Sequence, residues 1–191
     1  HYINPGTGGL YKNGADINIL PVWKEYTTGS SDVIVNVVDG GVDLTHEDLK
    51  EVVIEGGRNG SWNFLDGSST IVAHDHGTHV AGTIAAINNN GKGVCGIAGG
   101  EDGKGGVKIL SSQIFKYNPK TGKDDSGDSA SAIVWGADHG AVISQNSWGY
   151  DFKTEKDALN STIDAATKSA VDYFIRYAGT DKSGNQTGPM K

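Results

Sequence analysis

Two short segments hold the side chains best suited to chemistry. The first is Asp39, which follows the β-branched run 33–38 and precedes a Gly-Gly pair. The second is segment 74–79, His-Asp-His-Gly-Thr-His, which opens a run of small residues with helical spacing. Ligands of open α/β sheets bind beyond the carboxyl ends of the strands, so Asp39 is a candidate catalytic carboxylate. Capping of the following turn is the alternative role for this aspartate.

His76 is a candidate general base. A histidine in a first helical turn feels the positive end of the helix dipole, which favours the neutral imidazole. The three histidines of this segment also allow a metal-dependent hydrolase built on His74, His76 and His79. The spacing from His76 to His79 differs from the His-Glu-x-x-His pattern of zinc proteases, and the glutamate is missing. A metal-dependent hydrolase is therefore the less favoured alternative to a role of His76 as a general base.

The pattern of the remaining chain predicts the elements that position these residues. Strand-like runs alternate with apolar positions at steps of three or four, which is typical of an α/β domain with a parallel sheet. We expect a doubly wound, mainly parallel sheet with helices on both faces, and an exposed polar loop over 116–128. The expected strands are 33–38, 52–54, 107–115 and 141–144, and the expected helices centre on 80–87 and 130–137 and span 157–177, with Ser129 as a helix cap.

Composition narrows the classes of protein. A chain of 191 residues fits one domain, 1–191, and the net charge of −7 gives no reason to expect a nucleic-acid partner. No apolar run approaches the roughly 20 residues of a membrane span. The single cysteine, Cys95, excludes an internal disulfide and is expected to pack as a small hydrophobe. Gly82, inside the predicted helix, is expected to admit a neighbouring backbone.

Segments 35–43 and 76–83 together resemble the first two signatures of the subtilisin-like serine proteases. They occur in the family's order, with Asp39 and His76 separated by 37 positions. The resemblance continues through 88–98 and 145–149. It implies a subtilisin-like fold and a serine endopeptidase in which Asp39 orients His76, and His76 accepts the proton of a serine hydroxyl.

The same resemblance implies binding sites for a substrate and a cation. Ser147, Trp148 and Gly149 are similar to the family's Ser-Leu-Gly stretch, whose backbone lines the primary specificity pocket and pairs with an extended polypeptide. A tryptophan in place of leucine changes that pocket. Calcium is the implied cofactor, and a simple turn at 90–91 without an ion is the alternative. The positions that match calcium ligands are Asp48, Ile87, Asn89 and Val94.

Two signatures of the family do not occur in the 191 residues: the Gly-Thr-Ser nucleophile and the oxyanion asparagine. We therefore expect that the chain is the N-terminal portion of a subtilisin-like peptidase domain, truncated before the nucleophile helix and inactive alone. The serine and asparagine are expected beyond Lys191. The expected partners are a polypeptide substrate and a propeptide or the C-terminal remainder, and the expected location is secreted, cell-surface or periplasmic. A catalytically dead, protease-derived peptide-binding module is the other alternative.

Overall fold

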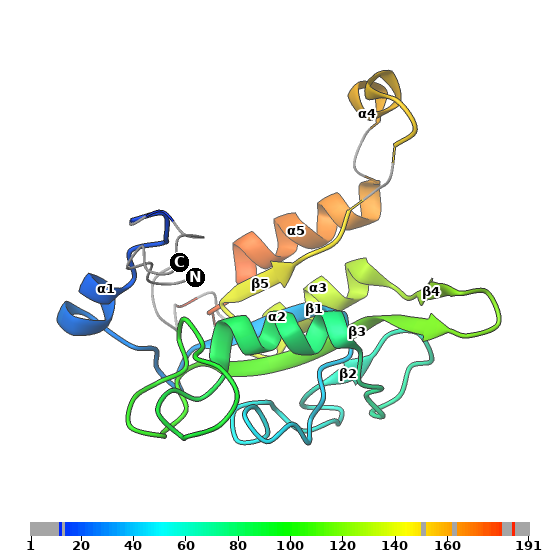
Figure 1. Ribbon diagram of the computed structural model, residues 1–191. Helices are drawn as coiled ribbons and strands as arrows, with labels where there is room; N and C mark the ends of the chain where they lie inside the picture. The colour runs from blue at the N-terminus through cyan, green and yellow to red at the C-terminus, as the bar shows by residue number, and fades with distance from the viewer. Residues whose placement is uncertain (1–11, 13, 150–151, 162–163, 181–184, 186–191) are drawn as a thin grey trace.

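The computed structural model describes residues 12, 14–149, 152–161, 164–180 and 185. A parallel sheet with the strand order β2-β3-β1-β5 lies at its centre, and β4 pairs antiparallel with β3 (Figure 1). The strands are β1 Ile34–Gly40, β2 Trp62–Asn63, β3 Lys108–Asn118, β4 Lys123–Ser126 and β5 Ile143–Asn146. The helices are α1 Leu20–Glu25, α2 Asp75–Ala85, α3 Ser129–Asp138, α4 Glu155–Asn160 and α5 Ala165–Tyr177.

Strand β1 is covered on both faces, as its continuous β-branched sequence predicts. Val35 and Val37 belong to the core cluster that includes the buried alanines of α2. Val38 points to the opposite face of the sheet, because side chains alternate along a strand. It belongs to the cluster formed with α3 and α5. The helices therefore flank both faces of a parallel sheet, and the predicted fold class is confirmed.

A buried polar side chain ties this strand to α3. Asn36 is fully buried, and its Nδ2 donates to the Ala132 carbonyl at 3.0 Å. Its Oδ1 accepts from the Ser112 hydroxyl of β3 at 2.7 Å. Gly136 leaves room for it, because a Cβ there would lie 2.2 Å from the Asn36 amide nitrogen. The asparagine thereby joins two strands and a helix with its hydrogen bonds satisfied.

Three of the predicted elements differ in the structure. The run 52–54 makes an isolated bridge between Val53 and Ile109 rather than a strand. The expected helix 157–177 is two helices, because Asp164 accepts a hydrogen bond from the Thr167 amide and so caps a new helix. The polar segment 116–128 is exposed as expected, but it contains the hairpin of β3 and β4. Charged and turn-forming residues there hid the strand pattern.

The cap of α3 also differs from the prediction. Asp128, not Ser129, is the N-cap, and its carboxylate accepts from the Ser131 amide at 2.9 Å and the Ser131 hydroxyl at 2.6 Å. These bonds lower the pKa of Asp128. Ser129 is the first residue of the helix. In the part of the chain that the structure describes, no helix combines the length and apolarity needed to cross a membrane.

Candidate active site

The structure brings Asp39 and His76 into direct contact. Asp39 is the last residue but one of β1, and His76 lies in the first turn of α2. Asp39 Oδ1 is 2.7 Å from His76 Nδ1 and also accepts from the Gly40 amide at 2.6 Å. The Asp39 side chain is 2% exposed, whereas that of His76 is 55% exposed. A buried carboxylate therefore holds one ring nitrogen, and the Nε2 edge of the ring is available to solvent or substrate.

The close approach of strand and helix depends on Gly77. A Cβ built on this residue would lie 1.9 Å from the Gly40 carbonyl oxygen, so only glycine fits without displacement. The role of admitting a neighbouring backbone, predicted for Gly82, belongs to Gly77 instead, and the prediction for Gly82 is wrong. A Cβ on Gly82 would have nothing within 4 Å, because this face of α2 borders a cavity. The close approach occurs five residues earlier, at the turn that carries the catalytic candidate.

One oxygen of the pair has no hydrogen-bond partner among the described residues. This oxygen is Oδ2 of Asp39, which is buried and accepts no hydrogen bond from the described residues. Leaving a buried acceptor unpaired costs about 1–3 kcal/mol, and more for a charged group. A donor placed against Oδ2 would remove this cost and would further fix the carboxylate that faces His76.

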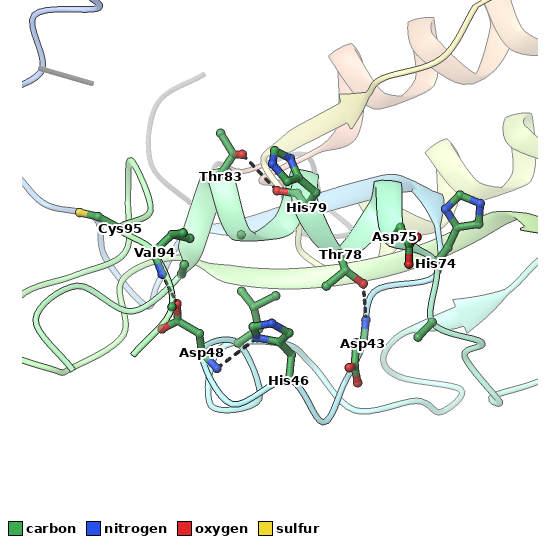
Figure 2. Close-up of a pocket in the computed structure, with 15 residues that line it drawn as sticks. Asp43, His46, Asp48, His74, Asp75, Thr78, His79, Thr83, Val94 and Cys95 are labelled. Atoms are coloured by element: carbon green, nitrogen blue, oxygen red, sulfur yellow. Dashed lines mark hydrogen bonds between the residues drawn. The ribbon is translucent and has the colours of Figure 1, made fainter. Parts of the chain in front are cut away.

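The histidines of segment 74–79 do not share a partner, because His74 contacts the His76 amide and Asp124, and His76 contacts Asp39. His74 Nδ1 accepts from the His76 amide at 3.1 Å, and its Nε2 is 3.3 Å from Asp124 Oδ1 of β4. The ring of His79 lies across α2 from Asp43 (Figure 2). Among the described residues, no three histidine, cysteine, aspartate or glutamate side chains gather as a metal site. The geometry thus favours a pair of Asp39 and His76 over a three-histidine ligand set.

The predicted substrate segment follows β5 and lies beside the end of β1. Strand β5 pairs with β1 in parallel, with Val38 opposite Asn146. Trp148 is half-buried, packs against the core cluster of α3 and α5, and donates from Nε1 to the Val38 carbonyl at 3.1 Å. Ser147 and Gly149 are exposed. The indole therefore anchors the segment next to Asp39 and leaves the exposed flanking residues toward solvent.

A cavity of about 1040 Å³ lies between α2 and the loops 43–49 and 93–95 (Figure 2). Two of its lining residues are bonded to each other, since Thr78 Oγ1 accepts from the Asp43 amide at 3.0 Å. Hydrogen bonds from the hydroxyl and the backbone of Thr45 lower the pKa of Asp43. Gly82 also lines this cavity, which accounts for the open space above it.

Ile87 and Val94, two of the predicted calcium ligands, contact Asp48, which is a third. Asp48 is buried, and its Oδ1 accepts from Asn90 Nδ2 at 2.6 Å. Its Oδ2 accepts from the Val94 amide at 2.9 Å (Figure 2). The Ile87 amide donates to the Asp48 carbonyl at 3.2 Å. Asp48, Ile87 and Val94 therefore come together, but the asparagine side chain that meets Asp48 is Asn90, one residue beyond Asn89. Asn89 instead takes a left-handed conformation, with φ of 59°.

The expected packing of Cys95 is wrong. The residue is exposed, and its thiol lies 2.9 Å from Asn88 Oδ1, to which it donates. Desolvation and the charge of Asp48 raise the pKa of this thiol. Cys95 is therefore directed toward solvent. Its hydrophobic neighbours in the sequence, Val94 and Ile97, did not indicate this exposure.

The fold and the site together define a class of protein. A parallel α/β sheet holds a buried aspartate at the end of a central strand, and this aspartate binds a histidine at the start of the next helix. An aspartate that contacts a histidine in this way is also found in the catalytic triads of nucleophile-based hydrolases. The model of the subtilase family, Peptidase S8, matches residues 30–188, and the chain belongs to this family.

Individual relatives support the same assignment. Fervidolysin from Fervidobacterium pennivorans is 41% identical over 150 residues, covering 75% of this chain and 20% of that protein. Kexin from Saccharomyces cerevisiae is 33% identical over 154 residues, covering 78% of this chain and 16% of kexin. The chain therefore spans about a fifth of the length of these curated relatives.

Solved structures show the same fold. The crystal structure of fervidolysin superposes with a TM-score of 0.56 and 32% identity, covering 86% of this chain and 22% of that one. The crystal structure of a lanthipeptide protease gives a TM-score of 0.53 and 25% identity, covering 83% of this chain and 41% of that one. The subtilisin-like arrangement expected from the sequence is thereby confirmed.

Proposed function

We propose that Asp39 and His76 are two members of an Asp-His-Ser triad in a serine endopeptidase. The observation that carries the proposal is the 2.7 Å contact between a buried carboxylate and Nδ1 of a half-exposed imidazole. His76 Nε2 takes the proton of the serine hydroxyl as its oxygen attacks the peptide carbonyl. The imidazolium then gives this proton to the leaving amine, and Asp39 stays ionised and stabilises the cation throughout.

The nucleophilic serine and the oxyanion asparagine are proposed to come from residues outside 1–191. The family pattern for either group does not occur in this sequence, and the chain spans only 20% of fervidolysin. On this proposal the 191 residues bind and orient but do not turn over substrate.

The proposed substrate is an extended polypeptide that pairs with the backbone of Ser147–Gly149. The support is the position of this segment beside the end of β1 and its anchoring through the Trp148 indole. Because that indole points into the core, the tryptophan is proposed to fix the wall of the specificity pocket rather than to fill the pocket. A secreted, cell-surface or periplasmic location remains a prediction.

Calcium is proposed to bind beside Asp48. The support is a buried carboxylate surrounded by a loop rich in carbonyl and amide oxygens, which are the ligands that Ca²⁺ prefers. Asn90 now donates to the same carboxylate and accepts from the Lys92 amide at 2.9 Å. Ion and amide thus compete for Asp48 Oδ1, so binding requires the Asn90 amide to rotate and present its oxygen. Asn90 replaces Asn89 in the proposed ligand set.

Thermal unfolding tests the calcium proposal directly. Adding calcium to residues 1–191 should raise the melting temperature, and excess chelator should reverse the rise, because a ligand that binds only the folded state stabilises it. Asp48→Asn should abolish the response. An unchanged melting temperature across millimolar calcium would refute the site.

Peptide hydrolysis tests the proposed reaction. The complete product of the gene should cleave a polypeptide, and residues 1–191 should show only background hydrolysis. In subtilisin, loss of the serine lowers turnover by on the order of a million-fold and loss of an oxyanion donor by about 10²–10³. A complete product that binds peptide but does not cleave it would indicate the peptide-binding module instead. Cleavage by residues 1–191 at the rate of the complete product would contradict the proposal.

A further inference from the structure

His74 joins three elements around the candidate catalytic histidine. Its backbone amide donates to the Gly41 carbonyl at 2.7 Å, and its carbonyl accepts from the Thr78 amide at 3.0 Å. Its ring packs over Gly40, where a Cβ would lie 2.5 Å from the ring. Gly40 directly follows Asp39. The ring of His74 therefore lies between the strand that carries Asp39 and the helix that carries His76.

The hydrogen bonds of the ring fix its tautomer. Nδ1 accepts from the His76 amide at 3.1 Å and acts as the N-cap of α2, so this nitrogen carries no proton. In a neutral imidazole the proton is then on Nε2, which lies 3.3 Å from Asp124 Oδ1. The His74 side chain is 19% exposed and that of Asp124 is 41% exposed. Asp124 thus stabilises the one tautomer in which His74 can cap the helix.

We propose that His74 is a positioning residue for His76 and that Asp124 acts through it. The relay runs from β4 through the His74 ring to the His76 amide, while Asp39 holds the His76 ring. The hairpin of β3 and β4 is thereby coupled to the first turn of α2. For catalysis this inference rests on the proposed function, but the relay itself is a property of the described residues.

Histidine tautomers and amide exchange test the relay without turnover. Long-range ¹H–¹⁵N spectra of residues 1–191 at pH 8, above the usual histidine pKa of about 6.5, should show the Nε2–H tautomer for His74. Removing Asp124 with Asp124→Ala should shift part of the His74 population to the Nδ1–H tautomer, which cannot accept from His76. Loss of a cap is worth about 1 kcal/mol, so the His76 amide should exchange up to about fivefold faster.

Matched variants separate the relay from general destabilisation. Asp125→Ala removes a neighbouring carboxylate that bonds Asn118, and it should leave His76 exchange unchanged. His74→Asn keeps a capping oxygen but no link to the hairpin, so adding Asp124→Ala in that background should have no further effect. His74→Ala should accelerate His76 exchange on its own.

Two results would overturn the proposal. One is an Nδ1–H tautomer for His74 in the unmodified chain. The other is equal His76 exchange in Asp124→Ala and Asp125→Ala. In an active complete gene product, His74→Ala should lower kcat with KM unchanged, and His74→Asn should restore it. Because the spectra need no nucleophile, failure of the relay and failure of the proposed peptidase activity are distinguishable.

Discussion

Replacement of Gly77 by alanine tests how strand β1 and helix α2 are held together. The added Cβ would lie 1.9 Å from the Gly40 oxygen and 2.7 Å from its carbon, whereas real contacts of this kind stay beyond 3.0 Å. Strand and helix must separate by about 1 Å to admit it. Overpacking of this kind costs about 1–3 kcal/mol, which exceeds the gain of up to about 1 kcal/mol from replacing a helical glycine by alanine. Gly77→Ala should therefore lower the free energy of unfolding.

The same displacement should weaken the contact between Asp39 and His76. Their 2.7 Å hydrogen bond spans the junction that must open. The signal for it is the His76 Nδ1 proton, which should broaden or move in the spectrum of the variant. Urea unfolding of residues 1–191 measures the free energy of unfolding. The unfolding midpoints of the variant and the unmodified chain are compared, provided that the dependence of this free energy on urea concentration is the same in both.

Gly82→Ala is the matched control in the same helix. Nothing lies within 4 Å of its added Cβ, so the variant should be more stable than the unmodified chain by up to about 1 kcal/mol. The two alanines should thus shift the midpoint in opposite directions. A Gly77→Ala chain as stable as Gly82→Ala would refute the packing argument.

Three further variants test single contacts by urea unfolding. Trp148→Phe should cost about 1 kcal/mol, because the bond to the Val38 carbonyl is lost while most packing stays; an unchanged midpoint would contradict the anchoring. Asn36→Ala should cost about 1–3 kcal/mol by leaving its buried partners unpaired, and a neutral result would show that they find other partners. The lowered pKa of Asp128 means that ionisation stabilises the fold above the ordinary value of 3.8, and this stability is lost as pH falls through the lower folded-state value. Asp128→Asn should remove this contribution to the pH dependence, and an equal slope of stability against pH in both chains would show that Asp128 does not contribute it.

The residues that the sequence predicted best are those whose roles follow from local pattern. The β-branched run before Asp39 predicts a strand covered on both faces, and Asp39 lies at its end. His76 lies in the first turn of a helix, as the small-residue run after it predicts. The contact between Asp39 and His76 could thus be predicted from the sequence, because strand end and helix start meet at one edge of the sheet.

The features that the sequence did not predict depend on contacts between distant segments. The link from His74 to Asp124 joins residues 50 positions apart, and no local pattern indicates it. Asp48 contacts the side chain of Asn90 rather than that of Asn89 because of the conformation of a loop, not because of residue type. Gly77 and Gly82 look alike in a helical pattern, and only the position of the Gly40 carbonyl separates their roles. Such contacts are set by tertiary packing, which residue spacing does not encode.

On the proposed function, His76 activates a serine that lies outside residues 1–191. Labelling the complete gene product with a fluorophosphonate, followed by mapping of the modified peptide, tests for this serine. We predict one labelled serine outside residues 1–191, and loss of labelling in a folded His76→Ala variant. Three results would contradict the proposed function. They are a labelled serine within residues 1–191, labelling that continues in His76→Ala at an unchanged rate, and no labelling of the folded product.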